Sequence, residues 1–390
     1  MHTHTTVEPL IDDEYTGEPP AKRLLAYLQD QRERGAKIVG TYCGYAPAEL
    51  IRALGLVRAS LCAFSNATIE AAEEVLPANL CPLVKSSYGF IMKDTCPFFA
   101  ISDAVIGETT CDGKKKMFEL IADRKPMHVM DLPQLPDEPE AIDDWAAAIR
   151  KVRRFLESVF GLTTRDDRIE AAIRETNAKS RRMNEIFEYA ALNPPVIGWP
   201  ELYDALFLAQ GASGDDMAPI LDGVLKKLET RKRDGYVYGP KGAPRVMVTG
   251  CPLGGDSLKV LHLIEEAGGV VVALDACSGM KPYANMIEED TGDPVRAMAA
   301  RYLKIPCSCM TPNDRRLTEM DRLIEKFKPG AVVDVVLQAC HSYSIESIKV
   351  GKHVQGTHGL PFLKIVTDYS QSDVGQIRTR VEALLEMCRQ

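Results

Sequence analysis

Short apolar runs rich in β-branched residues recur along this chain, and helical stretches separate them. In the first half the runs that predict strands are 37–43, 57–61, 104–108 and 126–130, and in the second half they are 245–249, 270–274, 331–337 and 362–367. Strands that are apolar throughout and separated by helices are typical of parallel sheets covered on both faces. The sequence therefore predicts the α/β class, with two similar doubly wound, Rossmann-like domains.

Changes in composition divide the 390 residues into four predicted segments. Residues 1–20 are polar and acidic and are predicted to be a mobile tail, and residues 21–140 form an N-terminal α/β domain. Residues 141–235 follow a helical pattern with many alanines and charges, and residues 236–390 return to the strand–helix alternation as a C-terminal α/β domain. Proline-rich linkers flank the helical segment, which is either an insertion or a bridge between the domains.

The charge balance and the apolar pattern exclude several classes of partner. The net charge is −8 and no basic stripe with interleaved aromatic residues occurs, so no nucleic acid is expected as a partner. No apolar run reaches about 18 residues, so no membrane helix is expected. The start of the chain also lacks the basic-then-apolar pattern of a signal peptide. We therefore expect a cytoplasmic protein whose thiols stay reduced.

Ten of the eleven cysteines lie after predicted strands or in predicted loops. Six follow the ends of predicted strands: Cys43, Cys62, Cys111, Cys251, Cys277 and Cys340. Four lie in predicted loops, namely Cys81, Cys96, Cys307 and Cys309, and Cys388 lies on the last helix. Ligands of open parallel sheets bind beyond the carboxyl ends of the strands, so this distribution predicts a thiol-lined site. The alternative is that free cysteines merely fill core space.

The spacing of the cysteines narrows the kind of site. No C-x-x-C occurs, which excludes a zinc ribbon, a thioredoxin-type motif and a ferredoxin run. A closed all-cysteine zinc site needs four thiolates, whereas many widely spaced cysteines fit a larger iron–sulfur cluster better. Zinc, or thiols that only pack, remain alternatives. The phosphate-binding G-x-x-x-x-G-K-[ST], the G-x-G-x-x-G fingerprint and the G-x-S-x-G elbow are all absent, so ATP hydrolysis by this chain itself is not expected.

Several segments that carry these cysteines resemble a known superfamily. They are Thr41–Leu50, Leu76–Gly89, Glu108–Lys116, Val333–His341 and Thr367–Ser370. Together they are similar to the 2-hydroxyacyl-CoA dehydratase and benzoyl-CoA reductase superfamily. Within it, three further segments resemble the double-cubane cluster proteins: Asp94–Phe99, Thr249–Gly255 and Ile305–Met310. That branch carries two [4Fe–4S] cubanes joined by a bridging sulfide.

The resemblance implies a set of cluster ligands in the cleft between the two domains. Dehydratase subunits hold one [4Fe–4S] cluster on three cysteines, which match Cys81, Cys111 and Cys340. A double-cubane [8Fe-9S] cluster needs three more thiolates, for which five cysteines compete: Cys43, Cys96, Cys251, Cys307 and Cys309. We favour Cys43, Cys96 and Cys309, with Cys307 as a close rival.

Polar residues beside these cysteines are candidates for tuning and proton transfer. Lys85 and Lys114 are expected to bind or tune the negatively charged cluster. Lys85, Tyr88 and His341 are the candidate catalytic residues. The alternatives are a solvated first helical turn for the lysine run that contains Lys114 and a core histidine for His341.

The resemblance implies an iron–sulfur oxidoreductase component. It would receive low-potential electrons from a separate ATP-hydrolysing iron–sulfur activator and reduce a small-molecule substrate at the double cubane, as a homodimer. One alternative is a 2-hydroxyacyl-CoA dehydratase-type subunit with a single [4Fe–4S] cluster that acts on an acyl-CoA. Another is a non-catalytic iron–sulfur electron carrier.

Overall fold

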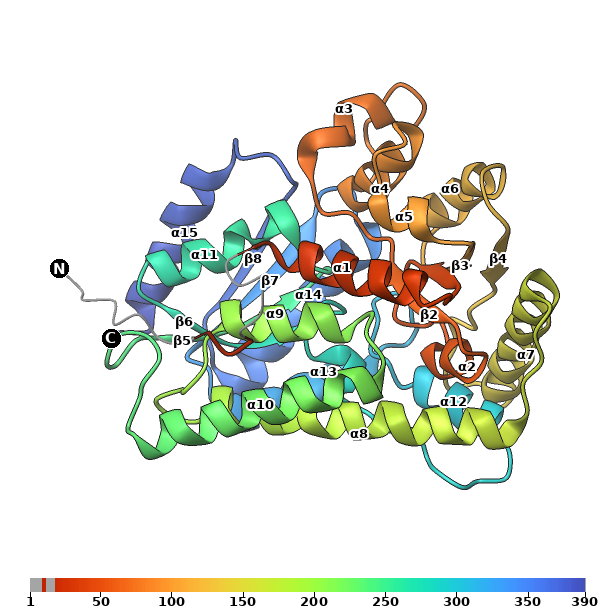
Figure 1. Cartoon of the computed structure of the whole chain (residues 1–390). Coiled ribbons are helices and arrows are strands. Elements are labelled where there is room, and N and C mark those ends of the chain that lie inside the picture. Colours follow the sequence, from red (N-terminus) through yellow and green to blue (C-terminus); the bar gives the residue numbers. More distant parts are fainter. Residues whose placement is uncertain (1–8, 12–17, 390) are drawn as a thin grey trace.

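Two parallel four-stranded sheets, one in each half of the chain, organise the molecule (Figure 1). The computed structural model describes residues 9–11 and 18–389. Sheet A has the order β2-β1-β3-β4 and contains β1 (Ile38–Thr41), β2 (Val57–Ser60), β3 (Ala104–Glu108) and β4 (Met127–Met130). Sheet B has the order β6-β5-β7-β8 and contains β5 (Arg245–Gly250), β6 (Val270–Asp275), β7 (Ala331–Leu337) and β8 (Phe362–Thr367). The α/β class with two doubly wound sheets is confirmed.

The two sheets share one topology. In each, the first strand in sequence pairs with the second on one side and with the third on the other, so the strand order reverses between the first and third strands. Every residue of β3 and of β7 is buried, as expected for central strands covered on both faces. The apolar, β-branched composition that predicted these strands is thus explained by burial on both sides.

The helices of the N-terminal domain are more numerous than the sequence predicted. They are α1 (Pro20–Glu33), α2 (Ala48–Ala53), the 3₁₀ turn η1 (Asn66–Thr68), α3 (Ile69–Ala72), α4 (Pro82–Met92), α5 (Pro97–Ile101) and α6 (Asp112–Ala122). The helices α3, α4 and α5 were not predicted from the sequence. Cys81 and Cys96 lie in loops as predicted, each directly before one of these helices, α4 and α5.

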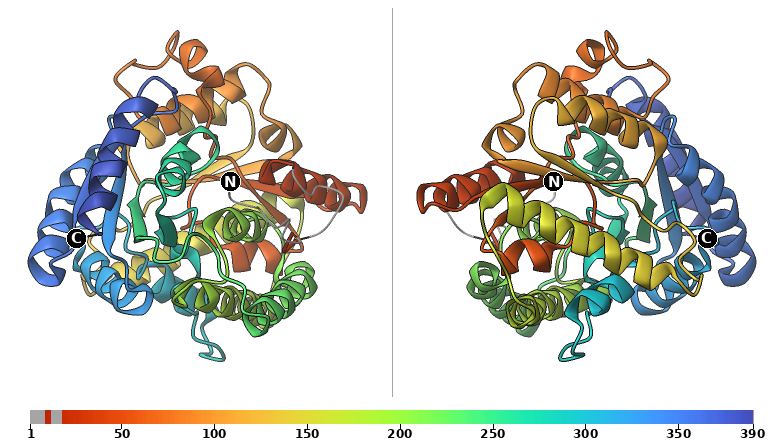
Figure 2. Two further views of the ribbon diagram at one scale, coloured as in Figure 1. Left: turned by 90° about the vertical axis from the view of Figure 1, so that its left-hand side faces the viewer. Right: turned by 90° about the vertical axis from the view of Figure 1, so that its right-hand side faces the viewer.

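The helical segment consists of α7 (Ala141–Phe160), α8 (Asp166–Ala191), α9 (Trp199–Ala209) and α10 (Gly214–Arg233). Helix α8 contacts α2 of the N-terminal domain and β6 of the C-terminal domain, and in Figure 1 it runs along the lower edge beneath both. Helix α8 therefore contacts elements of both halves of the chain. Figure 2 shows the N-terminal helices in orange, the C-terminal helices in blue and the green segment arranged around the strands of both sheets.

The C-terminal domain adds η2 (Gly255–Leu258), α11 (Lys259–Glu266), η3 (Lys281–Tyr283), α12 (Pro294–Tyr302), α13 (Asp314–Phe327), α14 (His341–His358) and α15 (Val374–Met387). Helix α12 packs against α7, and it shares a hydrophobic cluster with residues of the N-terminal domain. The Tyr302 hydroxyl donates a hydrogen bond to Glu49 at 2.7 Å, and the Tyr45 hydroxyl donates one to the Ile305 carbonyl at 3.3 Å. A segment of the second half therefore covers the first.

The predicted tail, residues 1–20, lies mostly outside the described residues, so its predicted mobility is not tested. Within its described part, Leu10 is buried and the Pro9 carbonyl accepts a hydrogen bond from Lys227 at 2.7 Å. Over residues 9–11 and 18–389, no helix combines the length and the apolar character that crossing a membrane requires.

Candidate metal centre

The cysteines occupy matching positions in the two domains. Three follow the first three strands of each sheet: Cys43, Cys62 and Cys111 in the N-terminal domain, and Cys251, Cys277 and Cys340 in the C-terminal domain. Two more lie between the second and third strands of each sheet: Cys81 and Cys96, and Cys307 and Cys309. Ligands of such sheets bind where the strand order reverses, and in both domains this crevice carries cysteines.

Four of these cysteines are N-caps of helices. Cys81 precedes α4, Cys96 precedes α5, Cys111 precedes α6 and Cys340 precedes α14. The Cys96 sulfur accepts a hydrogen bond from the backbone N–H of Phe99, and the Cys111 sulfur accepts one from that of Lys114, both at 3.3 Å. A helix N-terminus favours the thiolate, which is the form that binds metal. At Cys96 the backbone donors oppose the effect of burial, which still raises the pKa of the thiol above its ordinary value.

The first thiol group joins Cys81 of the N-terminal domain to Cys251 and Cys340 of the C-terminal domain. They meet in one small hydrophobic cluster, where hydrogen bonds from Cys251 and from Cys81 lower the pKa of the Cys340 thiol. Gly250 (φ 118°) lets the chain turn into Cys251, because a Cβ there would lie 2.1 Å from the Val335 carbonyl oxygen.

The second thiol group contains Cys43, Cys277, Cys307 and Cys309. Cys43 and Cys309 pack against the hydrophobic cluster that contains buried Cys307. A hydrogen bond from Cys309 lowers the pKa of Cys307 to about 6, whereas burial and the neighbouring Cys307 raise the pKa of Cys277 to about 11. Cys307 and Cys309 lie in the loop after α12, and the packing of α12 on the N-terminal domain brings that loop to Cys43.

Both groups therefore draw cysteines from both domains. Within the described residues, no three cysteine sulfurs lie within 4.8 Å of one another. A single Zn²⁺ with Zn–S bonds of about 2.3 Å holds its sulfurs ~3.8 Å apart, so the thiols are spaced too widely for one such ion without movement. An all-thiol donor set with wide spacing fits an iron–sulfur cluster.

Of the other cysteines, Cys62 also packs against the cluster of the first thiol group, whereas Cys96, Cys111 and Cys388 lie outside both groups. Cys62 donates to the Tyr42 carbonyl at 2.8 Å, and Cys62 and Cys96 line an apolar cavity of about 340 Å³. Cys111 is exposed, and its helix approaches the segment before Cys81, since a Cβ on Gly113 would lie 2.7 Å from Leu80. Cys388, at the end of α15, donates to the Leu384 carbonyl of that helix and to the Gly330 carbonyl before β7. Of the favoured trio, the structure brings Cys43 and Cys309 together, but Cys96 packs in a different cluster beside Cys62.

The two candidate lysines differ in their surroundings. Lys114 is buried, and its ammonium donates to the Tyr42 carbonyl at 3.5 Å. Burial alone would lower its pKa, but the nearby Cys43, Cys62 and Glu108 raise it above the ordinary value. Lys85 instead bonds Glu73 at 2.6 Å and the Ala78 carbonyl at 2.7 Å, which fastens the segment before α4. Lys114 is therefore the lysine placed to act on the thiols.

The candidate proton donors Tyr88 and His341 are more exposed than Lys114. Tyr88 is half-buried on α4, where it packs against the hydrophobic cluster around Phe118. His341 is the exposed first residue of α14, directly after Cys340. Tyr45, in contrast, is buried and its hydroxyl already donates to a backbone carbonyl.

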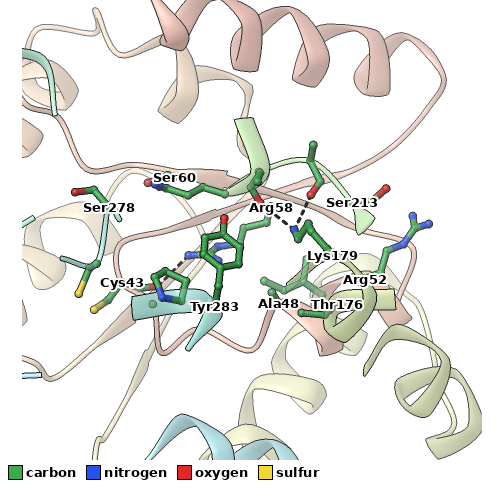
Figure 3. A pocket seen from close by; sticks show the side chains of 18 of the residues that line it. Cys43, Ala48, Arg52, Arg58, Ser60, Thr176, Lys179, Ser213, Ser278 and Tyr283 are labelled. Atoms are coloured by element: carbon green, nitrogen blue, oxygen red, sulfur yellow. Dashed lines mark hydrogen bonds between the residues drawn. The ribbon is translucent and has the colours of Figure 1, made fainter. Parts of the chain in front are cut away.

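A cavity of about 160 Å³ lies between the two domains and the helical segment (Figure 3). Three cysteines line it, namely Cys43, Cys62 and Cys277, together with several cationic side chains. Arg58 donates to the Cys43 carbonyl at 3.1 Å, and Lys179 donates to the carbonyls of Ala209 and Ala212, each at 2.9 Å. Burial lowers the pKa of Lys179 to about 8, and the charge of Arg58 adds to this effect.

Sequence analysis missed both of these cations. Arg58 was visible as a charged residue inside an apolar strand beside the crevice, whereas Lys179 lies in the middle of a long polar helix and carries no sequence signal. Cations beside thiols, in a cavity that both domains enclose, suit a small anionic ligand.

Comparisons with known proteins give a consistent result. A family model described as 2-hydroxyglutaryl-CoA dehydratase, D-component, matches residues 43–388. The chain is 42% identical over 361 residues to a protein of Escherichia coli (strain K12) with the provisional name dehydratase subunit YjiM, covering 92% of this chain and 94% of that protein. It is 21% identical over 392 residues to the (R)-2-hydroxyglutaryl-CoA dehydratase, subunit beta, of Acidaminococcus fermentans, covering 97% and 99%. It is 23% identical over 359 residues to the lactoyl-CoA dehydratase subunit beta of Anaerotignum propionicum, covering 91% and 92%.

Proposed function

Because the chain belongs to the 2-hydroxyglutaryl-CoA dehydratase D-component family, we propose that it is the iron–sulfur subunit of a dehydratase-type enzyme that acts on a small acyl-CoA. The observation that carries this proposal is the first thiol group, in which Cys81 of one domain meets Cys251 and Cys340 of the other. A cluster bound there would transfer single electrons, and its potential would depend on surrounding charge and hydrogen bonds.

Three cysteines would hold a [4Fe–4S] cluster. Cys81 and Cys340 are central to the group and each directly precedes a helix, and the hydrogen bonds from Cys251 and from Cys81 lower the pKa of the Cys340 thiol. Cys111 is the third ligand that the resemblance implies, and it also caps a helix on the exposed side. Cys251 competes for this place, because its thiol, like that of Cys81, interacts with Cys340 directly.

The cavity supports a small reacting group. At about 160 Å³ it is smaller than the ~300–1,000 Å³ of drug-sized pockets, so it accommodates an acyl head and not a whole coenzyme. Arg58, Lys114 and Lys179 give it positive charge that would orient a carboxylate or a thioester oxygen. In this reading the coenzyme portion stays outside, and the reacting carbon lies beside the thiols.

The test is an anaerobic purification followed by iron and acid-labile sulfide counts, and then by activity. Iron near four per chain, with enoyl-CoA formed from a 2-hydroxyacyl-CoA when the ATP-hydrolysing activator and a partner subunit are added, supports the proposal. Cys340→Ser should lose the iron, whereas Cys388→Ser, at the end of α15, should keep it. Protein that carries no iron when made without oxygen would overturn it.

A second candidate function rests on the second thiol group. Its four cysteines lie in the same interdomain region and exceed what a single cubane needs. This surplus favours a double-cubane [8Fe-9S] cluster and a homodimeric reductase of a small molecule, which the same activator would supply. Cys43, Cys307 and Cys309 would then hold the second cubane, and Cys307 takes the place given to Cys96 by sequence. Iron near eight per chain distinguishes this candidate from the first.

A further inference from the structure

Two histidines and an aspartate converge at the end of α14 that is remote from the cysteines. His353 and His358 lie in the last two turns of α14, and Asp321 lies on the neighbouring α13. The Nε2 atoms of both rings are 2.6 Å from the same carboxylate oxygen, Oδ1 of Asp321. The side chains are 18%, 21% and 44% exposed for His353, His358 and Asp321, so the group is open to ions on one side.

These side chains bring together three ligand atoms of the kinds that bind metal ions. Within the described part of the chain, no other three His, Cys, Asp or Glu side chains bring their ligand atoms within 4.8 Å of one another. No described lysine or arginine forms an ion pair with Asp321. The Thr357 hydroxyl lies 3.4 Å from Nδ1 of His353. Metal-bound histidines usually bond an oxygen through the second ring nitrogen in this way, which fixes the ring and leaves Nε2 for the metal.

We propose that Asp321, His353 and His358 bind one Zn²⁺ ion. Imidazole nitrogen with one carboxylate oxygen suits zinc, and three protein ligands leave a fourth tetrahedral position for water. At bond lengths of about 2.0–2.1 Å, two ligands of one Zn²⁺ lie ~3.3 Å apart, so each ring has to move out by less than 1 Å from its present contact. The partial exposure of all three side chains permits that movement.

The ion would stabilise α14 at its C-terminal end. His358 is the last residue of the helix, and a cation there interacts favourably with the helix dipole. The 18 residues of α14 span ~27 Å, with Cys340 capping the opposite end. The zinc site is therefore separate from the thiol groups. It would nevertheless connect α14, the helix that begins after Cys340, to α13. It is independent of the proposed function.

The experiment uses the intact protein, purified anaerobically with its iron and stripped of loose metal by a chelator. Zinc titrated by calorimetry should bind with one equivalent, and the double variant His353→Gln/His358→Gln should lose that equivalent. His262→Gln, an exposed histidine on α11, is the matched control and should bind zinc like the wild type. Far-UV circular dichroism of each variant reports whether it is folded.

Cobalt separates this site from the cysteines. Co²⁺ bound by nitrogen and oxygen gives visible d–d bands without the intense near-ultraviolet band of thiolate ligation, and the wild type but not the double variant should show it. Equal zinc stoichiometry in the wild type and the double variant, or a cobalt spectrum of thiolate type only, would overturn the proposal. So would wild-type protein that takes up no zinc, in which case the three residues are only a hydrogen-bonded group.

Discussion

Replacing Lys281 by methionine is expected to destabilise the C-terminal domain strongly. The Lys281 ammonium lies 3.7 Å from Oδ1 of Asp275, and both side chains are 2% exposed. Thr249 donates a hydrogen bond of 2.7 Å to the other carboxylate oxygen, but within the described residues no hydrogen bond reaches Oδ1 or the ammonium. The pair is therefore held by charge. At an effective dielectric constant of 20, this separation corresponds to roughly 4.5 kcal/mol of attraction.

The measurable loss should be of that order. Removing one partner of a buried pair leaves an uncompensated charge, so Lys281→Met should lower the free energy of unfolding in urea by ~3–5 kcal/mol. The double variant Lys281→Met/Asp275→Asn should recover most of this loss, because the buried charge is gone and the amide oxygen still accepts from Thr249. Lys22→Met is the matched control, since its ion pair with Glu18 is exposed and should contribute less than about 1 kcal/mol.

The Lys281→Met substitution should also alter the pKa of a cysteine in the second thiol group. The Cys309 hydrogen bond lowers the pKa of Cys307 most, and Lys281 lowers it further. In Lys281→Met, alkylation of Cys307 should therefore require a higher pH. A loss of stability below 1 kcal/mol together with an unchanged alkylation profile would refute the electrostatic reasoning.

Three other outcomes are expected. Burial raises the pKa of Glu265 to about 7 from 4.5, so between these pH values the folded state keeps a proton that the unfolded state releases. The free energy of unfolding should therefore fall by up to ~3.4 kcal/mol as pH rises through this window, and urea titrations at several pH values should show no such fall in Glu265→Gln. Burial lowers the pKa of Lys179 to about 8, so its ammonium loses its charge as pH rises through 8. A small carboxylate should therefore bind more weakly above this pH, and calorimetry should find no such pH dependence in Lys179→Met. In a double-cubane protein, Cys307→Ser should lose iron while Cys96→Ser retains it, and the reverse order in iron counts would restore the ligand choice made from sequence.

The strands were predictable because burial on both faces leaves a plain signal in the sequence. The runs 104–108 and 331–337 coincide with β3 and β7, in which every residue is buried. The run 362–367 coincides with β8, an edge strand that is only partly buried and is marked by its β-branched residues. The positions of Cys111 after β3 and of Cys340 after β7 followed directly. The parallel topology then brings the strand ends of each domain to one edge, as expected.

The helices that were not predicted, α4 in the first half of the chain and α14 in the second, lack the signal that amphipathic helices give. In α14, Ile345 and Ile348 are 69% and 61% exposed, so its apolar residues do not mark one buried face. Helix α4 has the opposite character, because it is buried on most sides, and its small residues allow close packing. A Cβ on Gly89 would lie 2.3 Å from the Thr68 carbonyl oxygen, which shows how closely this helix approaches its neighbour. Neither pattern has the period on which helix prediction depends.

The grouping of the thiols was beyond sequence for a different reason. It depends on two contacts between the domains. Cys81 packs beside the ends of the C-terminal strands, and the loop of Cys307 and Cys309 packs beside Cys43. The second contact requires α12 to pack against the N-terminal domain and not against its own sheet, and there the Tyr302 hydroxyl donates a hydrogen bond to Glu49. Local pattern determines which strand a cysteine follows, but side-chain packing between distant segments determines which cysteines meet. A cluster bound by cysteines of both domains would join the domains covalently through its iron atoms. Loss of a ligand at either thiol group should therefore weaken the contact between the domains as well as release metal.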